Sequence, residues 1–231
     1  MQRRNRPELM DQPEIDEREL ATDLGNLAWI NRLLGGIAVI RAHLPRWGGG
    51  VAPDRWTVLD VATGGGDIPR WMVRRGLPVE VVAADLHPQM LRQARAWSVG
   101  LPIRFIRCDA RHLPFRDRSV DLVLCSLMLH HLTEADAAQV LRELGRVARR
   151  RLIVNDLRRS RVAYGLIWLI TRLSRNRLTR YDSPVSVERA FTPAELEVLA
   201  REAGLDRQGK VRVYQHRHYR MALVFEPAAV S

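Results

Sequence analysis

The sequence predicts an α/β protein built on a doubly wound, mostly parallel sheet of seven strands. Three observations support this prediction. From residue 56 onward, short apolar segments alternate with amphipathic ones, as in repeated βαβ units. The first apolar segment runs into three glycines. Acidic residues end the first three strands, at the sheet edge where open α/β sheets bind ligands.

The order of the elements follows from this alternation. Parallel strands are expected at 56–61, 79–84, 103–107, 120–126 and 151–156. Helices are expected at 67–76, 88–98, 134–149, 160–174 and 193–203. The last two strands, 207–215 and 217–225, are consecutive and therefore predict an antiparallel hairpin at one edge of the sheet.

Residues 14–50 are expected to be helical and to form an N-terminal lid. Apolar residues recur there at three- and four-residue steps, and Gly35-Gly36 is expected to kink or split the helix. Residues 1–13 are expected to form a disordered tail, and the glycine-rich stretch 46–55 a linker.

Composition narrows the functional class. The net charge is +11, and Lys210 is the only lysine among 37 basic residues. Such charge attracts anions, including nucleic acids, but the arginines are scattered rather than gathered on one helix or arm. The charge pattern therefore does not favour a nucleic-acid partner.

The expected location is the cytoplasm. Cys108 and Cys125 lack the CxxC spacing of a metal site and lie in apolar runs, which favours reduced thiols. No apolar segment follows the basic N-terminus, so no secretory signal is expected. The apolar run at 162–170 is far shorter than the roughly 20 residues of a membrane span, which predicts a soluble protein.

The stretch VLDVATGGGDIP, residues 58–69, forms the expected ligand loop. Its glycines allow close backbone approach to a ligand, and the following helix N-terminus offers free N–H groups. Pro69 stands where the dinucleotide fingerprint has its third glycine. Alone, the loop is compatible with several nucleotides, or with a tight turn that holds no ligand.

The acids after the first three strands make the prediction more specific. Asp85 ends the second strand, 21 residues after Gly64, where an acid accepts the hydroxyls of a ribose or caps the next helix. Asp109 and Ala110 follow the third strand, where the acid could bond the exocyclic amine of an adenine. With Asp60, three acids converge on one sheet edge.

These motifs resemble those of the class I S-adenosylmethionine-dependent methyltransferases. LDVATGGGD is similar to the family's first motif, AADLHPQML to its second, and CDARHLPFRDRSVDLVLCSLMLHHL to its third and fourth. The resemblance implies a Rossmann-like methyltransferase fold for residues 51–231, with a helical insertion at about 158–190. It also implies S-adenosylmethionine as cofactor and S-adenosylhomocysteine as product. No metal is expected, because the fourth strand ends in Cys125-Ser126 and the fifth in Asn155-Asp156, where metal-dependent catechol methyltransferases have an acid and an Asp-Asn pair. The implied cofactor contacts are Asp60, Ala62, Thr63, Gly64, Gly66, Asp85, Leu86, Asp109, Ala110, Ser126 and Leu127.

The run from Pro114 to Leu132 is similar to the subgroup that methylates small molecules, including quinone precursors and polyketides. The leading expectation is O-methylation of a small hydrophobic or aromatic acceptor, with C-methylation of a quinone precursor as the alternative. An RNA-modifying enzyme and an inactive binding protein remain as further alternatives. The proline-containing motif of nucleic-acid amino methyltransferases is replaced here by Cys125-Ser126-Leu127-Met128.

His130 and His131 are the candidate general bases, because they follow the fourth strand at the mouth of the crevice. Either could instead only line the pocket, and the sequence does not separate the two. Asn155 and Asp156 end the fifth strand, where they could contact substrate or belong to a turn.

The expected acceptor cover combines two apolar helices. Asn31 lies on the N-terminal helix, and Tyr164 and Trp168 lie on the helix after the fifth strand. The same apolar stripe would also suit a core position. Residues 181–191 read as a polar loop that gates the acceptor or links two helices. The protein is expected to be a monomer or a homodimer.

Overall fold

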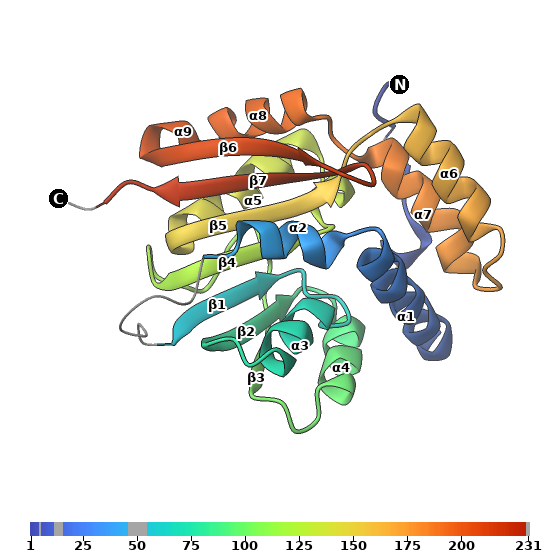
Figure 1. Cartoon of the computed structure of the whole chain (residues 1–231), viewed down its shortest axis with the longest axis horizontal. Coiled ribbons are helices and arrows are strands. Elements are labelled where there is room, and N and C mark those ends of the chain that lie inside the picture. Colours follow the sequence, from blue (N-terminus) through green and yellow to red (C-terminus); the bar gives the residue numbers. More distant parts are fainter. Residues whose placement is uncertain (5, 12–15, 46–54, 230–231) are drawn as a thin grey trace.

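A computed structural model describes residues 1–4, 6–11, 16–45 and 55–229 of the chain. Seven strands form one sheet in the order β3-β2-β1-β4-β5-β7-β6 (Figure 1). Strands β1 to β5 are parallel, and β7 runs antiparallel to both β5 and β6. The predicted fold class, including the edge hairpin, is confirmed. The strands are β1 (Trp56–Val61), β2 (Val79–Asp85), β3 (Ile103–Arg107), β4 (Val120–Ser126), β5 (Ala148–Leu157), β6 (Gly209–His216) and β7 (Arg220–Pro227).

Both faces of the sheet are covered, which explains why its central strands are apolar almost throughout. In β1, Val58 packs toward α2 and α3, while its neighbour Leu59 packs toward α5 and α8 on the other face. Helix α4 packs beside β2 and β3. These helices are α2 (Gly36–His43), α3 (Asp67–Arg74), α4 (Pro88–Trp97), α5 (Glu134–Val147), α8 (Pro193–Glu202) and the short α9 (Leu205–Gln208).

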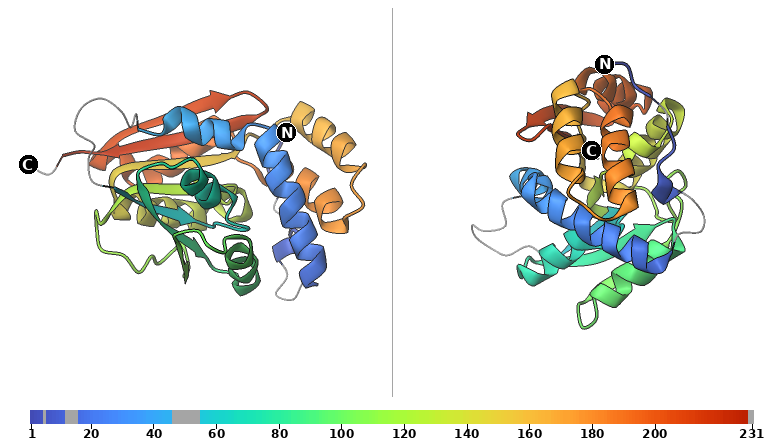
Figure 2. Two further views of the ribbon diagram at one scale, coloured as in Figure 1. Left: turned by 60° about the horizontal axis from the view of Figure 1, so that its bottom comes forward. Right: turned by 90° about the vertical axis from the view of Figure 1, so that its right-hand side faces the viewer.

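Three helices and a short 3-10 turn lie beyond the carboxyl ends of the parallel strands (Figure 1; right-hand view of Figure 2). We call them the lid: η1 (Leu9–Asp11), α1 (Glu17–Leu33), α6 (Arg161–Thr171) and α7 (Arg177–Arg189). The expected split of the N-terminal helix occurs at Gly35, whose φ of 78° separates α1 from α2. The lid therefore combines the N-terminal helix with the helices that follow β5.

Residues 181–191 do not form the polar loop that the sequence suggested. Most of them belong to α7, which begins after Asn176, whose side chain accepts a hydrogen bond from Thr179 N. Pro184 lies inside this helix. Several of its polar residues are buried, and the N-terminal segment contacts one of them: Asp182 accepts hydrogen bonds from Leu9 N at 2.7 Å and Met10 N at 3.0 Å.

The same contacts correct the expectation of a disordered tail over residues 1–13. In residues 1–4 and 6–11, Arg3 donates to the carbonyl of Arg189, and Ser186 Oγ donates to Glu8 at 3.0 Å. The predicted linker at 46–55 lies, except for Arg55, outside the described residues. Among the helices that the structure describes, none has the length and apolar character needed to cross a bilayer.

Candidate functional site

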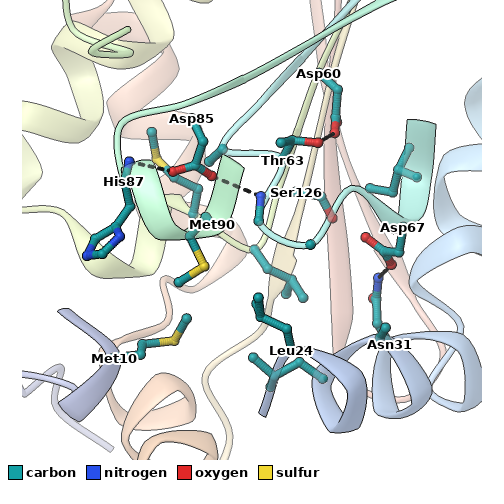
Figure 3. A pocket seen from close by; sticks show the side chains of 18 of the residues that line it. Met10, Leu24, Asn31, Asp60, Thr63, Asp67, Asp85, His87, Met90 and Ser126 are labelled. Atoms are coloured by element: carbon teal, nitrogen blue, oxygen red, sulfur yellow. Dashed lines mark hydrogen bonds between the residues drawn. The ribbon is translucent and has the colours of Figure 1, made fainter. Parts of the chain in front are cut away.

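A cavity of about 350 Å³ opens at the carboxyl ends of β1, β2 and β4, which we call the strand-edge cavity (Figure 3). Figure 3 shows Met10 and Leu24 facing it from the lid. Many of the residues expected to bind the cofactor line it. These are Asp60, Ala62, Thr63, Gly64, Asp85, Leu86, Ser126 and Leu127.

The turn between β1 and α3 is shaped by its glycines. Gly64 and Gly66 have φ values of 52° and 73°, in the left-handed region that favours glycine. A Cβ on Gly65 would lie 2.9 Å from the Trp97 ring. Gly66 is the N-cap of α3 and does not line the cavity itself. The turn thus brings the backbone of Gly64 and Gly65 to the cavity wall.

Asp60 is a buried acid, and only one of its two carboxylate oxygens accepts a hydrogen bond from the described residues. Its Oδ2 accepts a hydrogen bond from Thr63 Oγ at 2.6 Å, and its Oδ1 has no partner among the described residues. Burial raises the pKa of Asp60 to about 8, against the opposing hydrogen bond from Thr63, and the charges of Asp67 and Asp85 add to the rise. A cationic ligand in the cavity would favour the ionised carboxylate.

Asp85 connects the two turns that form the cavity floor. Its Oδ2 accepts from Gly64 N and its Oδ1 from His87 N, both at 2.9 Å (Figure 3). Burial raises the pKa of Asp85, and these hydrogen bonds oppose the rise. The acid makes no side-chain cap on α4, whose N-cap is His87.

Asp109 and Ala110 line a neighbouring hollow of about 280 Å³. It shares Ala62, Asp85 and Leu86 with the strand-edge cavity. The side chain of Arg111 donates to Asp109, at 2.7 Å from Nη2, and this hydrogen bond lowers the pKa of Asp109. Asp109 is therefore an ionised hydrogen-bond acceptor beside the cavity.

A second cavity, of about 210 Å³, lies under the lid, and we call it the lid cavity. It adjoins the strand-edge cavity because five residues line both: Met10, Leu27, Asn31, Leu127 and His131. Leu127 adopts a left-handed φ of 57°, uncommon for a side chain of this kind. An engineered cavity of about 150 Å³ holds benzene, so the lid cavity has room for a small aromatic molecule.

The face that α6 turns toward the lid cavity differs from the one expected. Ala163, Leu166, Ile167 and Ile170 line the cavity, at the spacing of one helical face. Tyr164 lies on the neighbouring face and packs against the lid core instead. Trp168 is 42% exposed and stacks with Arg172, whose Cζ lies 4.4 Å from its ring centroid. Neither aromatic residue lines the cavity.

His130 and His131 differ in their surroundings, which the sequence did not reveal. They lie in η2 (Leu129–His131), and His130 is buried while its Nδ1 lies 2.6 Å from Asp156 Oδ1. Burial raises the pKa of Asp156, but the charge and hydrogen bond of His130 outweigh it, so the net direction is down. An ionised carboxylate only accepts hydrogen bonds, so Nδ1 donates to Asp156, while Nε2 faces Glu8 Oε1 at 3.9 Å.

Asn155 and Asp156 are both buried and line neither main cavity. Asn155 Nδ2 donates to Ser126 Oγ at 2.7 Å, and its backbone carbonyl accepts from Leu127 N at 2.8 Å. Asp156 accepts a hydrogen bond from the ring of His130 and another, at 3.2 Å, from the backbone N–H of His130. Both residues therefore position cavity residues rather than reach into a cavity.

Glu8, His130 and His131 form the one cluster, within the described ranges, whose ligand-type atoms could hold a metal ion. These atoms lie within 4.8 Å of one another. His130 Nε2 is 3.9 Å from Glu8 Oε1, and His131 Nδ1 is 3.8 Å from Glu8 Oε2. Glu8 also accepts from Ser186 Oγ, and His130 Nδ1 is engaged by Asp156.

Sequence reasoning missed several residues of the lid cavity. Glu8 and Met10 come from the segment expected to be disordered, and Asp182 comes from the segment expected to be a loop. His218 and Arg220 come from the edge hairpin. The one signal of these residues in the sequence was Arg220, a positively charged residue at the start of an apolar strand.

Comparisons with known proteins agree with this arrangement. Residues 58–151 match the family model described as a methyltransferase domain. A demethylmenaquinone methyltransferase of Deinococcus radiodurans is 45% identical over 108 residues, which cover 46% of this chain and 40% of that protein. A ubiquinone/menaquinone biosynthesis C-methyltransferase of Desulfotalea psychrophila is 37% identical over 95 residues, or 41% of this chain and 38% of the relative. The matched part thus spans less than half of these relatives.

A solved structure extends the likeness of fold to nearly the whole chain. A S-adenosylmethionine-dependent methyltransferase from Aquifex aeolicus aligns over 93% of this chain and 100% of its own, with a TM-score of 0.63 and 21% identity. The matched domain contains the turn after β1, the acid that ends β2 and the histidine-bearing η2. The likeness to methyltransferases thus covers residues 58–151 in sequence and nearly the whole chain in fold.

Proposed function

We propose that the protein transfers the methyl group of S-adenosylmethionine to a ring carbon of a small, mostly apolar phenol of the quinone-precursor type. The observation that carries this proposal is the pair of adjoining cavities with the His130–Asp156 pair at the second one. A methyl donor in the first cavity and a flat acceptor in the second would meet at their shared wall. The quinone-precursor relatives support the choice of acceptor class.

The strand-edge cavity fits this cofactor chemically. The unpartnered Oδ1 of Asp60 suits the ammonium group at the amino-acid end of the cofactor. Asp85 would accept the ribose hydroxyls, and Asp109 and Ala110 would frame the adenine. The bound cofactor supplies an electrophilic methyl group, and the chain's task is to align the acceptor and exclude water.

His130 is the base in this proposal. It lines the lid cavity, and its Nε2, which lies 3.9 Å from Glu8 Oε1, would take the proton of an acceptor hydroxyl when the ring is neutral. Asp156 stabilises the imidazolium that results. Loss of that proton delivers electron density to the ring carbons beside the oxygen, which makes them nucleophilic toward a methyl group. The methylated carbon then loses its ring hydrogen as a proton, which restores the aromatic ring, and the oxygen regains a proton.

O-methylation, our leading expectation from the sequence, is the second candidate. The same deprotonation by His130 produces a phenolate whose oxygen is also a nucleophile, so the base serves either product. The relatives named as C-methyltransferases favour the carbon. We further propose that the reaction takes place in the cytoplasm, which the free thiols of Cys108 and Cys125 support.

Methyl transfer from isotope-labelled S-adenosylmethionine to a panel of phenols and reduced naphthoquinones tests the proposal. The product's carbon spectrum distinguishes the two candidates, because an aryl methyl and a methoxy carbon resonate far apart. We expect an aryl methyl. Label in a methoxy group would select O-methylation, and absence of transfer across the panel, with the cofactor bound, would contradict both.

A further inference from the structure

The first residue of β7, Arg220, is a buried arginine at the wall of the lid cavity. It is 1% exposed, pairs across the sheet with Leu157, and lines the cavity together with it. Two of its donors, Nε and Nη1, have no hydrogen-bond partner among the described residues. Burying a cation without hydrogen-bond partners is costly, so within the described part of the chain this wall carries a guanidinium whose Nε and Nη1 are left unsatisfied.

The charge is present at neutral pH. Burial lowers the pKa of Arg220 to about 10, and the charges of Asp156 and Asp67 oppose this fall. The other arginine of the cavity, Arg158, already donates to Gln215 and lies over the Tyr219 ring, with Cζ 5.4 Å from the centroid. Arg220 is thus the cavity arginine with the larger unused bonding capacity.

The hairpin holds Arg220 in place. The turn before it contains His218 and Tyr219, with left-handed φ values of 56° and 54° that are uncommon outside glycine. Both residues line the same cavity, and the carbonyl of Tyr219 accepts from Arg158 N at 2.7 Å. Backbone strain of this kind persists where the surrounding structure enforces it, often at ligand sites.

We infer that Arg220 binds an ionised oxygen of the methyl acceptor, a phenolate or a carboxylate on an otherwise apolar ring. The inference rests on the proposed function, because it takes the lid cavity as the acceptor site. Apolar side chains of α6 would hold the ring, and the guanidinium would select the anion. Arg220 is then a specificity-determining residue on a strand outside the matched methyltransferase domain.

Calorimetry on the full chain saturated with S-adenosylhomocysteine tests this inference. The probes are 2-naphthoate against the neutral 2-naphthamide, and 4-nitrophenol, above the pH at which it ionises, against 4-nitroanisole. The wild type should prefer an anionic probe over its neutral counterpart by at least about tenfold, as expected for a charged hydrogen bond. A preference confined to the first pair assigns a carboxylate, and one confined to the second assigns a phenolate.

Arg220→Met should abolish that preference, while Arg220→Lys, which keeps the charge, should retain part of it. The matched control is Arg212→Met, which removes a charge from an exposed position on the same hairpin and should leave the preference unchanged. Equal affinities for both members of each pair in the wild type, or an unchanged preference in Arg220→Met, would overturn the inference. Failure of the proposed function would appear differently, as no binding of S-adenosylhomocysteine or no methyl transfer.

Discussion

His130 Nδ1 and Asp156 Oδ1 lie 2.6 Å apart in the interior, joining the turn after β4 to the end of β5. Asp156 also accepts from the backbone of His130 at 3.2 Å and from that of Leu157 at 2.7 Å. The carboxylate therefore fixes both the position and the hydrogen-bonding state of the imidazole. His131, by contrast, lines both cavities, and its Nδ1 lies 3.8 Å from Glu8 Oε2.

This difference predicts that the two histidines are not equivalent. His130→Ala should lower kcat by about 100-fold or more, the usual contribution of a general base, with little change in cofactor affinity. His131→Ala should keep kcat within about tenfold of the wild type, because it alters only the cavity wall. Steady-state kinetics of both variants measures the loss of kcat in each. Equal losses, or a greater loss for His131, would contradict the assignment of His130 as the base.

The buried Asp60 predicts a pH dependence of stability for the ligand-free protein. Its pKa rises from 3.8 to about 8 on folding. The folded state therefore holds this proton more tightly, and the stability it contributes is lost progressively as the pH rises through this range. Asp60→Asn has no such proton, so its melting temperature relative to the wild type should increase between about pH 5 and pH 8.

The control for this prediction is Asp206→Asn at an exposed position of α9. Its melting temperature should differ from that of the wild type by a constant amount across the same pH range. A constant difference for Asp60→Asn as well would mean that Asp60 is ionised in the folded protein.

The close approach of Gly36 to Asn31 predicts that a side chain at position 36 would disturb both cavities. A Cβ at this position would lie 1.7 Å from Asn31 Oδ1, and Asn31 lines both cavities while donating to Asp67 at 3.2 Å. Gly36→Ala should therefore displace Asn31, destabilise the fold by about 1–3 kcal/mol and weaken cofactor binding. Chemical denaturation and calorimetry measure the two effects.

Gly25→Ala is the matched control, because nothing lies within 4 Å of a Cβ at this position of α1. Alanine should stabilise the helix there by up to about 1 kcal/mol and leave binding unchanged. The same outcome for Gly36→Ala would show that Asn31 adapts without cost.

The sheet and the cofactor loop could be predicted because their signals are local. Strand periodicity, the glycines after β1 and the acid that ends β2 all act within a few residues. The lid depends on contacts between distant segments: Asp182 binds the backbone of Leu9, 173 residues away. No local pattern reports such a pairing, so the N-terminal segment looked disordered and α7 looked like a loop.

The candidate site likewise has a cofactor part that local sequence signals predict and an acceptor part that they do not. The residues expected around the cofactor follow strand ends, and most of them line the strand-edge cavity. The acceptor side depends on which face of α6 turns inward, and an apolar helix with Tyr164 and Trp168 does not reveal this. The role of Arg220 depends on the cavity that surrounds it, which only the folded chain defines.

The central claim, that the strand-edge cavity holds S-adenosylmethionine, is tested most directly by titrating S-adenosylhomocysteine into the wild type and Asp85→Ala. The wild type should bind one equivalent, and Asp85→Ala should bind at least about tenfold more weakly while keeping its circular dichroism spectrum, because the ribose loses a charged acceptor. Equal affinities for the two proteins, or no binding by the folded wild type, would contradict the account.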